Sequence, residues 1–116
     1  MKIKPMTANH EDFILPTRGS EESAGYDIYM PSDGVICSGE TVKVPLGFAS
    51  EIPPGFVALL LPRSGAGFKY GVELNNTCGV IDSDFRGEWV AALKLKDSSA
   101  SLEWKKGDRL LQFILI

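Results

Sequence analysis

The chain has 116 residues, a length typical of one domain, and we treat residues 1–116 as a single domain. Hydrophobic residues make up 44% of it and charged residues 23%, values that exclude a disordered segment. A net charge of −3 and no apolar run approaching ~20 residues argue against a nucleic-acid coat or a membrane protein, so a polyanionic ligand has to be held by a few local groups.

Short apolar segments, separated by glycines and prolines, predict β-strands. In chain order they are residues 2–4, 26–30, 34–38, 41–49, 56–62, 71–76, 88–96, 101–105 and 109–116. The segment EWVAALKLK has a period of two, and one of its faces carries Trp89, Ala91, Leu93 and Leu95. FVALLLP is apolar on both faces, as in a fully buried strand. SGAGFKY predicts one helix of a turn or two, so we expect an all-β fold, a distorted jelly-roll sandwich with at most one short helix.

The C-terminal segment RLLQFILI is apolar and has no polar tail after it. A flat hydrophobic strand at a terminus promotes aggregation. We therefore expect this strand to pair with another subunit, and further residues normally to follow it. Cys37 and Cys78 lack C-x-x-C spacing, and we expect both to be reduced thiols.

Two polar segments in the first half of the chain are candidates for a site. SAGYDIYMP places Asp27 inside a strand pattern, which alone is typical of a solvent-facing aspartate on an edge strand. LLPRSGAGFKYG places Arg63, Ser64 and Gly65 where a helix begins. Backbone N–H groups, a hydroxyl and a guanidinium at that point form an anion cradle. The alternative is a surface turn in which the serine caps the helix.

The third segment, LNNTCGVIDSDFRGEW, is bracketed by Gly79 and Gly87. Asp82 follows two apolar residues, which predicts partial burial, and a buried carboxylate usually has a task. Asp84 shares its face if the strand is regular. Two alternatives remain. Asp-Ser-Asp is also typical of a simple turn, and a pair of carboxylates is also typical of a glycosidase, which the small size of the chain disfavours.

The fourth segment, KKGDRLLQFIL, places Gln112 among apolar residues, where it needs a hydrogen-bond partner. Together, and in this order, the four segments resemble the conserved motifs of the trimeric dUTPase family, the dUTP pyrophosphatases. AGYDIY is similar to the first motif, PRSG to the second, GVIDSDFRGE to the third and GDRLLQ to the fourth. The match runs from about Pro16 to the C-terminus.

The resemblance implies a dUTP diphosphatase, an enzyme that hydrolyses dUTP to dUMP and pyrophosphate. This reaction limits uracil in DNA and supplies dUMP for dTTP synthesis. The resemblance also implies that Asp82 orients and deprotonates the water that attacks the α-phosphorus. The cofactor is Mg²⁺ on the triphosphate, and Asp27 holds it through the water ligands that this ion gives up reluctantly. The residues that match phosphate contacts are Arg63, Ser64, Gly65 and Gln112.

The third motif forms the uracil pocket in this family. The residues implied here are Asn76, Gly79, Val80 and Ile81, which pair with the polar edge of uracil. Cytosine presents the opposite donor pattern and leaves buried groups unpaired. Phe85 stands where the family usually has a tyrosine packed on the deoxyribose, and it keeps the ring face that clashes with a 2′-hydroxyl.

The resemblance further implies a homotrimer in which one subunit supplies the first, second and fourth motifs and its neighbour supplies the third motif, which we call the hairpin. We expect a cytoplasmic location, the host cytoplasm if the protein is viral. The family's fifth motif, a C-terminal arm, is absent from this chain, which stops at Ile116. We therefore expect weak Mg²⁺-dependent dUTP binding and slow hydrolysis. The alternatives are a catalytically weak, dUTPase-like nucleotide-binding or regulatory protein, and a dCTP deaminase, for which the hairpin offers no glutamate candidate.

Overall fold

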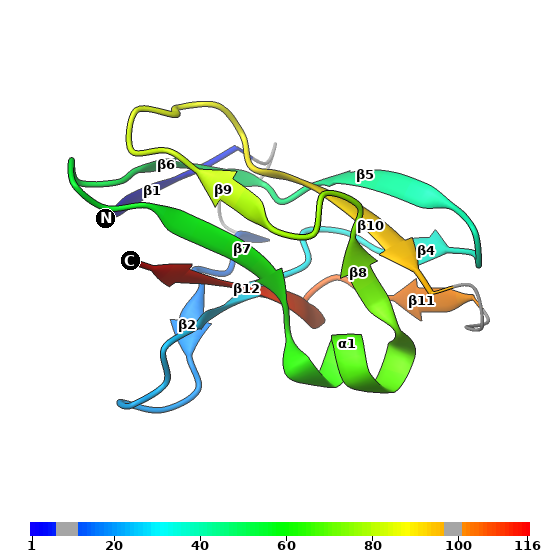
Figure 1. Cartoon of the computed structure of the whole chain (residues 1–116). Coiled ribbons are helices and arrows are strands. Elements are labelled where there is room, and N and C mark those ends of the chain that lie inside the picture. The colour runs from blue at the N-terminus through cyan, green and yellow to red at the C-terminus, as the bar shows by residue number, and fades with distance from the viewer. Residues whose placement is uncertain (7–11, 97–100) are drawn as a thin grey trace.

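The structure, a computed structural model, describes residues 1–6, 12–96 and 101–116 and consists of β-strands with one short helix (Figure 1). The strands are β1 (Lys2–Pro5), β2 (Thr17–Arg18), β3 (Tyr26–Tyr29), β4 (Gly34–Ile36), β5 (Thr41–Pro45), β6 (Phe48–Glu51), β7 (Ala58–Pro62), β8 (Val72–Leu74), β9 (Gly79–Ile81), β10 (Val90–Leu95), β11 (Leu102–Trp104) and β12 (Arg109–Leu115). The helix, α1, covers Ser64–Tyr70, where a helix was expected. Within the described part, no helix is long and apolar enough to cross a membrane.

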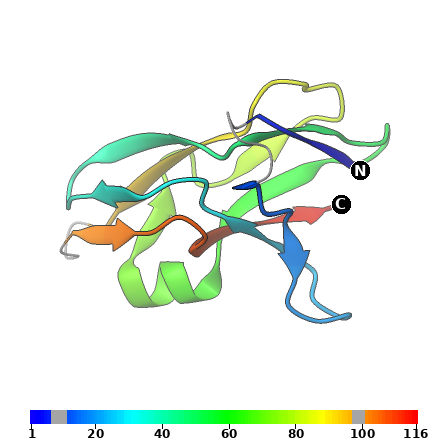
Figure 2. The ribbon, with the colours of Figure 1, turned by 180° about the vertical axis from the view of Figure 1, so that it is seen from behind.

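Antiparallel pairing arranges the strands in four sheets, and the two largest form the layers of a sandwich. One sheet has the order β2-β3-β12-β7-β9 and the other the order β5-β10-β8, while β1-β6 and β11-β4 are two-stranded. In Figure 2, seen from behind, the red β12 lies beneath the layer that contains β5. Side chains from both layers, among them Leu93 of β10 and Phe113 of β12, form one core. The predicted all-β, jelly-roll fold is confirmed.

Trp89 is a fully buried residue of the core and packs against two other aromatic rings. Its ring lies 4.8 Å from that of Phe48 and 5.2 Å from that of Phe113, and its Nε1–H donates to Ser50 Oγ at 3.0 Å. The period of two predicted for this strand is confirmed, because four alternate side chains are buried: Trp89, Ala91, Leu93 and Leu95. This anchoring fixes the end of the loop that carries Asp82.

Two predicted strands differ in detail, and two short strands were not predicted. The segment 41–49 is two strands, β5 and β6, because the chain turns at Gly47, whose φ is 85°. The segment 56–62 begins at Ala58, and Leu59 and Leu61 are only half-buried, so the strand is not buried on both faces. The short strands β2 and β9 were not predicted as strands. Pairing with β3 and β7 creates them, and those contacts are not local in the sequence.

The prediction that the C-terminal strand needs another subunit to cover it is wrong. β12 is a central strand, paired with β3 on one side and with β7 on the other. Its alternate residues Leu111 and Phe113 are buried in the chain's own core. The apolar terminal strand therefore gives no support to a trimer. Cys37 and Cys78 are free thiols.

Candidate active site

Three of the four motifs meet at adjacent strands of the five-stranded sheet. The first motif lies on β3, the fourth on β12, and the second where β7 passes into α1. Because β12 lies between β3 and β7, Gln112 is the cross-strand partner of both Asp27 and Leu61. Non-local strand pairing therefore assembles this part of the site.

Asp27 lies at the centre of the assembly and is only 8% exposed. Its Oδ1 lies 3.0 Å from Arg63 Nε, and its Oδ2 accepts a hydrogen bond from Arg109 Nη1 at 3.2 Å. The solvent-facing alternative for Asp27 is therefore wrong. A buried carboxylate needs such partners, and here they come from the second and the fourth motif.

The two arginines line a polar hollow of about 530 Å³. Its wall is made by Arg63, Gly65, Ala66, Tyr70, Gly107, Asp108, Arg109 and Leu110. The N-cap of α1 is Arg63 and makes no side-chain capping bond, so the alternative in which Ser64 caps the helix is wrong. Ser64 and Gly65 are exposed, and a Cβ on Gly65 would meet nothing within 4 Å. An anion can therefore approach the main chain at this point.

Gln112 has the hydrogen-bond partner that its setting requires. Its Nε2 donates to the carbonyl of Pro62 at 3.2 Å, and its side chain lies against Gly25, where a Cβ would overlap the amide. Gln112 thus links the first, second and fourth motifs. This contact accounts for the glycine in AGYDIY.

The third motif begins at β9, which pairs with β7 and is the last strand of its sheet. A tight turn precedes it: Cys78 N–H donates to the Asn76 carbonyl at 2.7 Å, and Thr77 between them has a φ of 70°. The Asn76 side chain closes the same turn, because its Nδ2 donates to the Cys78 carbonyl at 3.1 Å. Positive φ is costly for a β-branched residue, and such strain is typical of functional segments.

Asp82 lies directly after β9, at the start of a turn in which Phe85 N–H donates to its carbonyl at 3.1 Å. Its side chain is exposed, so the predicted partial burial is wrong for the single chain. Asp84 lies inside the turn, so the two carboxylates do not share a strand face. Phe85 is 42% exposed, and its ring lies against Gly87. Asp-Ser-Asp therefore forms a turn, as the alternative reading expected, and this turn leaves the Asp82 side chain exposed to solvent.

The hairpin stands apart from the arginine hollow within one chain. No residue from 76 to 85 lines that hollow, and β9 is separated from β12 by β7. The described residues therefore bring together Asp27, Arg63, Gln112 and their neighbours, but not Asp82.

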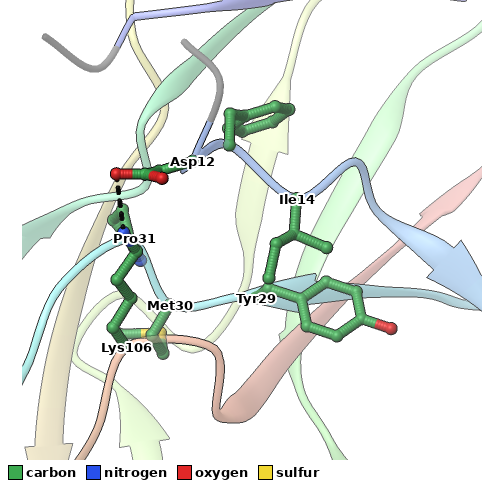
Figure 3. Close-up of a pocket in the computed structure, with 7 residues that line it drawn as sticks. Asp12, Ile14, Tyr29, Met30, Pro31 and Lys106 are labelled. Atoms are coloured by element: carbon green, nitrogen blue, oxygen red, sulfur yellow. Dashed lines mark ion pairs between the residues drawn. The ribbon is translucent and has the colours of Figure 1, made fainter. Parts of the chain in front are cut away.

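A second hollow, of about 190 Å³, lies beside Tyr29 and Met30 and contains none of the predicted site residues (Figure 3). In the close-up, Asp12 and Lys106 form an ion pair at one side of it, with Oδ2 and Nζ 3.3 Å apart. Both side chains are about half exposed, so this ion pair adds little stability.

Comparison with known proteins identifies the family of this chain. The dUTPase family model matches residues 11–116. The deoxyuridine 5′-triphosphate nucleotidohydrolase of Nautilia profundicola is 38% identical over 115 residues, which cover 99% of this chain and 80% of the relative. The chain belongs to the dUTPase family. The enzyme of the same name from Paramecium bursaria Chlorella virus 1 is 40% identical over 105 residues, covering 90% of this chain and 72% of the relative.

Solved dUTPases share the fold. The dUTPase of Staphylococcus bacteriophage 80alpha superposes with a TM-score of 0.86 at 22% identity, covering 99% of this chain and 88% of that one. A mutant dUTPase of phage phi11 of S. aureus gives a TM-score of 0.83 at 23% identity with the same coverage, and that protein coordinates a structural Mg(II) ion. These identities are low, so the likeness concerns the fold.

The sequence did not single out Arg109 as a site residue in this dUTPase-family chain. It lines the same hollow as Arg63 and bonds the same aspartate. Its guanidinium carbon also lies 5.9 Å from the centre of the Tyr29 ring. The available signal was its position directly after the Gly107–Asp108 turn, at the start of a strand that also carries Gln112.

Proposed function

We propose that this chain hydrolyses dUTP to dUMP and pyrophosphate. The observation that carries the proposal is the convergence of three dUTPase motifs on one hollow lined by Arg63 and Arg109, in a chain that belongs to the dUTPase family. Two guanidiniums suit a triphosphate because each presents planar N–H groups to anionic oxygens. The substrate belongs to the deoxynucleotide pool, which favours a cytoplasmic site of action.

In the proposed reaction, Asp82 orients a water molecule and takes its proton. The water oxygen forms a bond to the α-phosphorus, and the bond from that phosphorus to the bridging oxygen breaks. Pyrophosphate leaves with the electron pair, and the proton passes from the carboxylate to solvent. Carboxylates are weak bases at neutral pH, so positioning of the water contributes much of the effect. The exposed setting of Asp82 after β9 supports this role.

The hairpin is proposed to select uracil and deoxyribose. β9 is an edge strand, so the main chain of Gly79, Val80 and Ile81 has one side that faces away from β7 and can pair with a base. The turn closed by the Asn76 side chain lies directly before this edge strand. Phe85, held against Gly87, is proposed to pack on the sugar and exclude a 2′-hydroxyl.

Mg²⁺ fits this site as an ion carried mainly by the substrate. No group of three or more His, Cys, Asp or Glu side chains among the described residues forms a metal cage. Mg²⁺ keeps several waters and commonly binds through substrate phosphates with one or two carboxylates. Asp27 is proposed to contact those waters, because a carboxylate has about four acceptor sites and the arginines, among the residues that the structure describes, occupy two of them. The ion neutralises charge on the triphosphate when bound.

Ser64, Gly65 and Gln112 are proposed to complete the phosphate site. The first two are exposed at the start of α1, beside the arginine hollow. Gln112 reaches the same region from β12. A homotrimer is proposed to bring the hairpin of one subunit to the hollow of its neighbour. The separation of Asp82 from the hollow within one chain supports that arrangement. A stable monomer in sedimentation at micromolar concentration would exclude it.

The proposal is tested by incubating the chain with dUTP and Mg²⁺ and measuring pyrophosphate and dUMP. A dCTP deaminase would release ammonia from dCTP and would leave dUTP unhydrolysed. A regulatory, non-catalytic protein would bind a non-hydrolysable dUTP analogue without ever forming dUMP. Release of pyrophosphate from dUTP, with little from dCTP, supports hydrolysis.

A further inference from the structure

We infer that Asp27 is a positioning residue that holds Arg63 and Arg109 against the phosphate hollow, and that this role does not require a metal ion. The inference rests on the proposed function, because it gives these arginines the triphosphate as their ligand. It differs from the metal-holding role because it predicts that Asp27 still supports ligand binding after Mg²⁺ is removed.

Each oxygen of the Asp27 carboxylate contacts a different arginine. Oδ1 faces Arg63 Nε at 3.0 Å, and Oδ2 accepts from Arg109 Nη1 at 3.2 Å. The Asp27 side chain is only 12% exposed, so solvent screens these contacts weakly. One buried anion therefore sets the orientation of two cations, Arg63 at the start of α1 and Arg109 at the start of β12.

The arginines remain accessible on their outer side. The Arg63 side chain is 33% exposed and that of Arg109 is 44% exposed, and both line the hollow of about 530 Å³. Arg63 also donates from Nη1 to the Arg109 carbonyl at 3.0 Å, and its main-chain N–H donates to Leu110. A guanidinium has five N–H donors, so these bonds leave donors for a phosphate.

Without the carboxylate the two guanidiniums lose the anion that both of them contact. Like charges repel, and the Tyr29 ring, whose centre already lies 5.9 Å from the Arg109 guanidinium carbon, remains as another favourable contact of this side chain. We expect the two guanidiniums to move apart and Arg109 to lose its position for binding phosphate. Misplacing a binding group by about 1 Å is enough to weaken function by about 10²-fold.

The test uses Asp27→Asn and a non-hydrolysable dUTP analogue, with binding measured by calorimetry in EDTA and again in Mg²⁺. We expect the Kd to rise at least about tenfold in both conditions, because the asparagine N–H groups oppose a guanidinium. Glu103→Gln is the matched control: it removes a carboxylate whose nearest cation, Lys105, is 4.0 Å away and exposed, and it should leave both Kd values unchanged. Weakening that occurs only with Mg²⁺, or no weakening at all, overturns the inference.

A second variant covers the case in which Asp27→Asn does not fold. Arg109→Gln changes a side chain that is 44% exposed, so the fold should persist, and it should weaken analogue binding equally in EDTA and in Mg²⁺. Unchanged binding by this variant overturns the inference. The unmodified chain is assayed in parallel for pyrophosphate release from dUTP. A chain that fails there refutes the proposed function, whereas a chain that succeeds while the variants keep full binding in EDTA refutes only the positioning role.

Discussion

Gly87→Ala tests how the hairpin excludes ribose. A Cβ built on Gly87 would lie 2.8 Å from Phe85 Cζ and 3.1 Å from Cε1. Non-bonded carbons prefer about 3.5–4.0 Å, so the ring edge has to move by roughly 1 Å. Gly87 has no positive φ, so alanine adds this contact without backbone strain. The ring is 42% exposed and has room to swing toward solvent.

The displaced ring should admit a 2′-hydroxyl. A shape difference of this size in a pocket is worth about 1–3 kcal/mol, so the preference for dUTP over UTP should fall at least about tenfold. The assay is kcat/KM for both nucleotides, with Gly19→Ala as the control, because its Cβ would meet only Ser23 Oγ at 3.8 Å. A preference unchanged within twofold in a folded Gly87→Ala protein would refute the proposed role of Phe85.

Three further changes follow from the same structure. Asp82→Asn should abolish turnover and largely keep analogue binding, since the amide fills the same space but cannot take a proton; a variant that retained most of its kcat would exclude Asp82 as the base. Gly25→Ala should displace Gln112 and weaken analogue binding by about 1–3 kcal/mol in calorimetry, and an unchanged Kd would contradict the contact. A hydrogen bond with Glu40 and the charge of that residue raise the pKa of the Cys37 thiol, so less thiolate is present at pH 7.5. Glu40→Gln should therefore speed alkylation of Cys37 at that pH. An equal or slower rate of alkylation would refute this cause of the raised pKa.

Local patterns in the sequence predict the strands and the helix well. The period of two around Trp89 and the serine–glycine start of α1 are local signals, and the structure has both. The partner of the C-terminal strand was predicted wrongly, because its pairing depends on β3 and β7, which lie far away in the sequence. The strand pattern alone cannot distinguish a central strand from an unpaired one.

In the candidate site, too, local motifs predict the residues but not the contacts between residues that are distant in the sequence. The motifs identify Asp27 and Arg63, yet their ion pair and the participation of Arg109 depend on strand pairing that is not local, with Arg109 82 residues away from Asp27 in the sequence. For Asp82 the two apolar residues before it suggested burial. Instead β9 ends at Ile81 and the chain turns outward, so the carboxylate is exposed. Side-chain environment at the end of a strand depends on the turn that follows, and Asp-Ser-Asp favours a turn.

The central claim is hydrolysis of dUTP at the α-phosphorus by a base on the hairpin. The most direct measurement is a single-turnover assay with the 116-residue chain in excess over dUTP, in Mg²⁺ and ¹⁸O-labelled water, so that slow chemistry is still detected. We predict dUMP and pyrophosphate in equal amounts, the label in dUMP, little product from dCTP, and no product from Asp82→Asn. Label in the pyrophosphate, equal rates with dCTP, or no dUMP above the rate without protein would contradict the account.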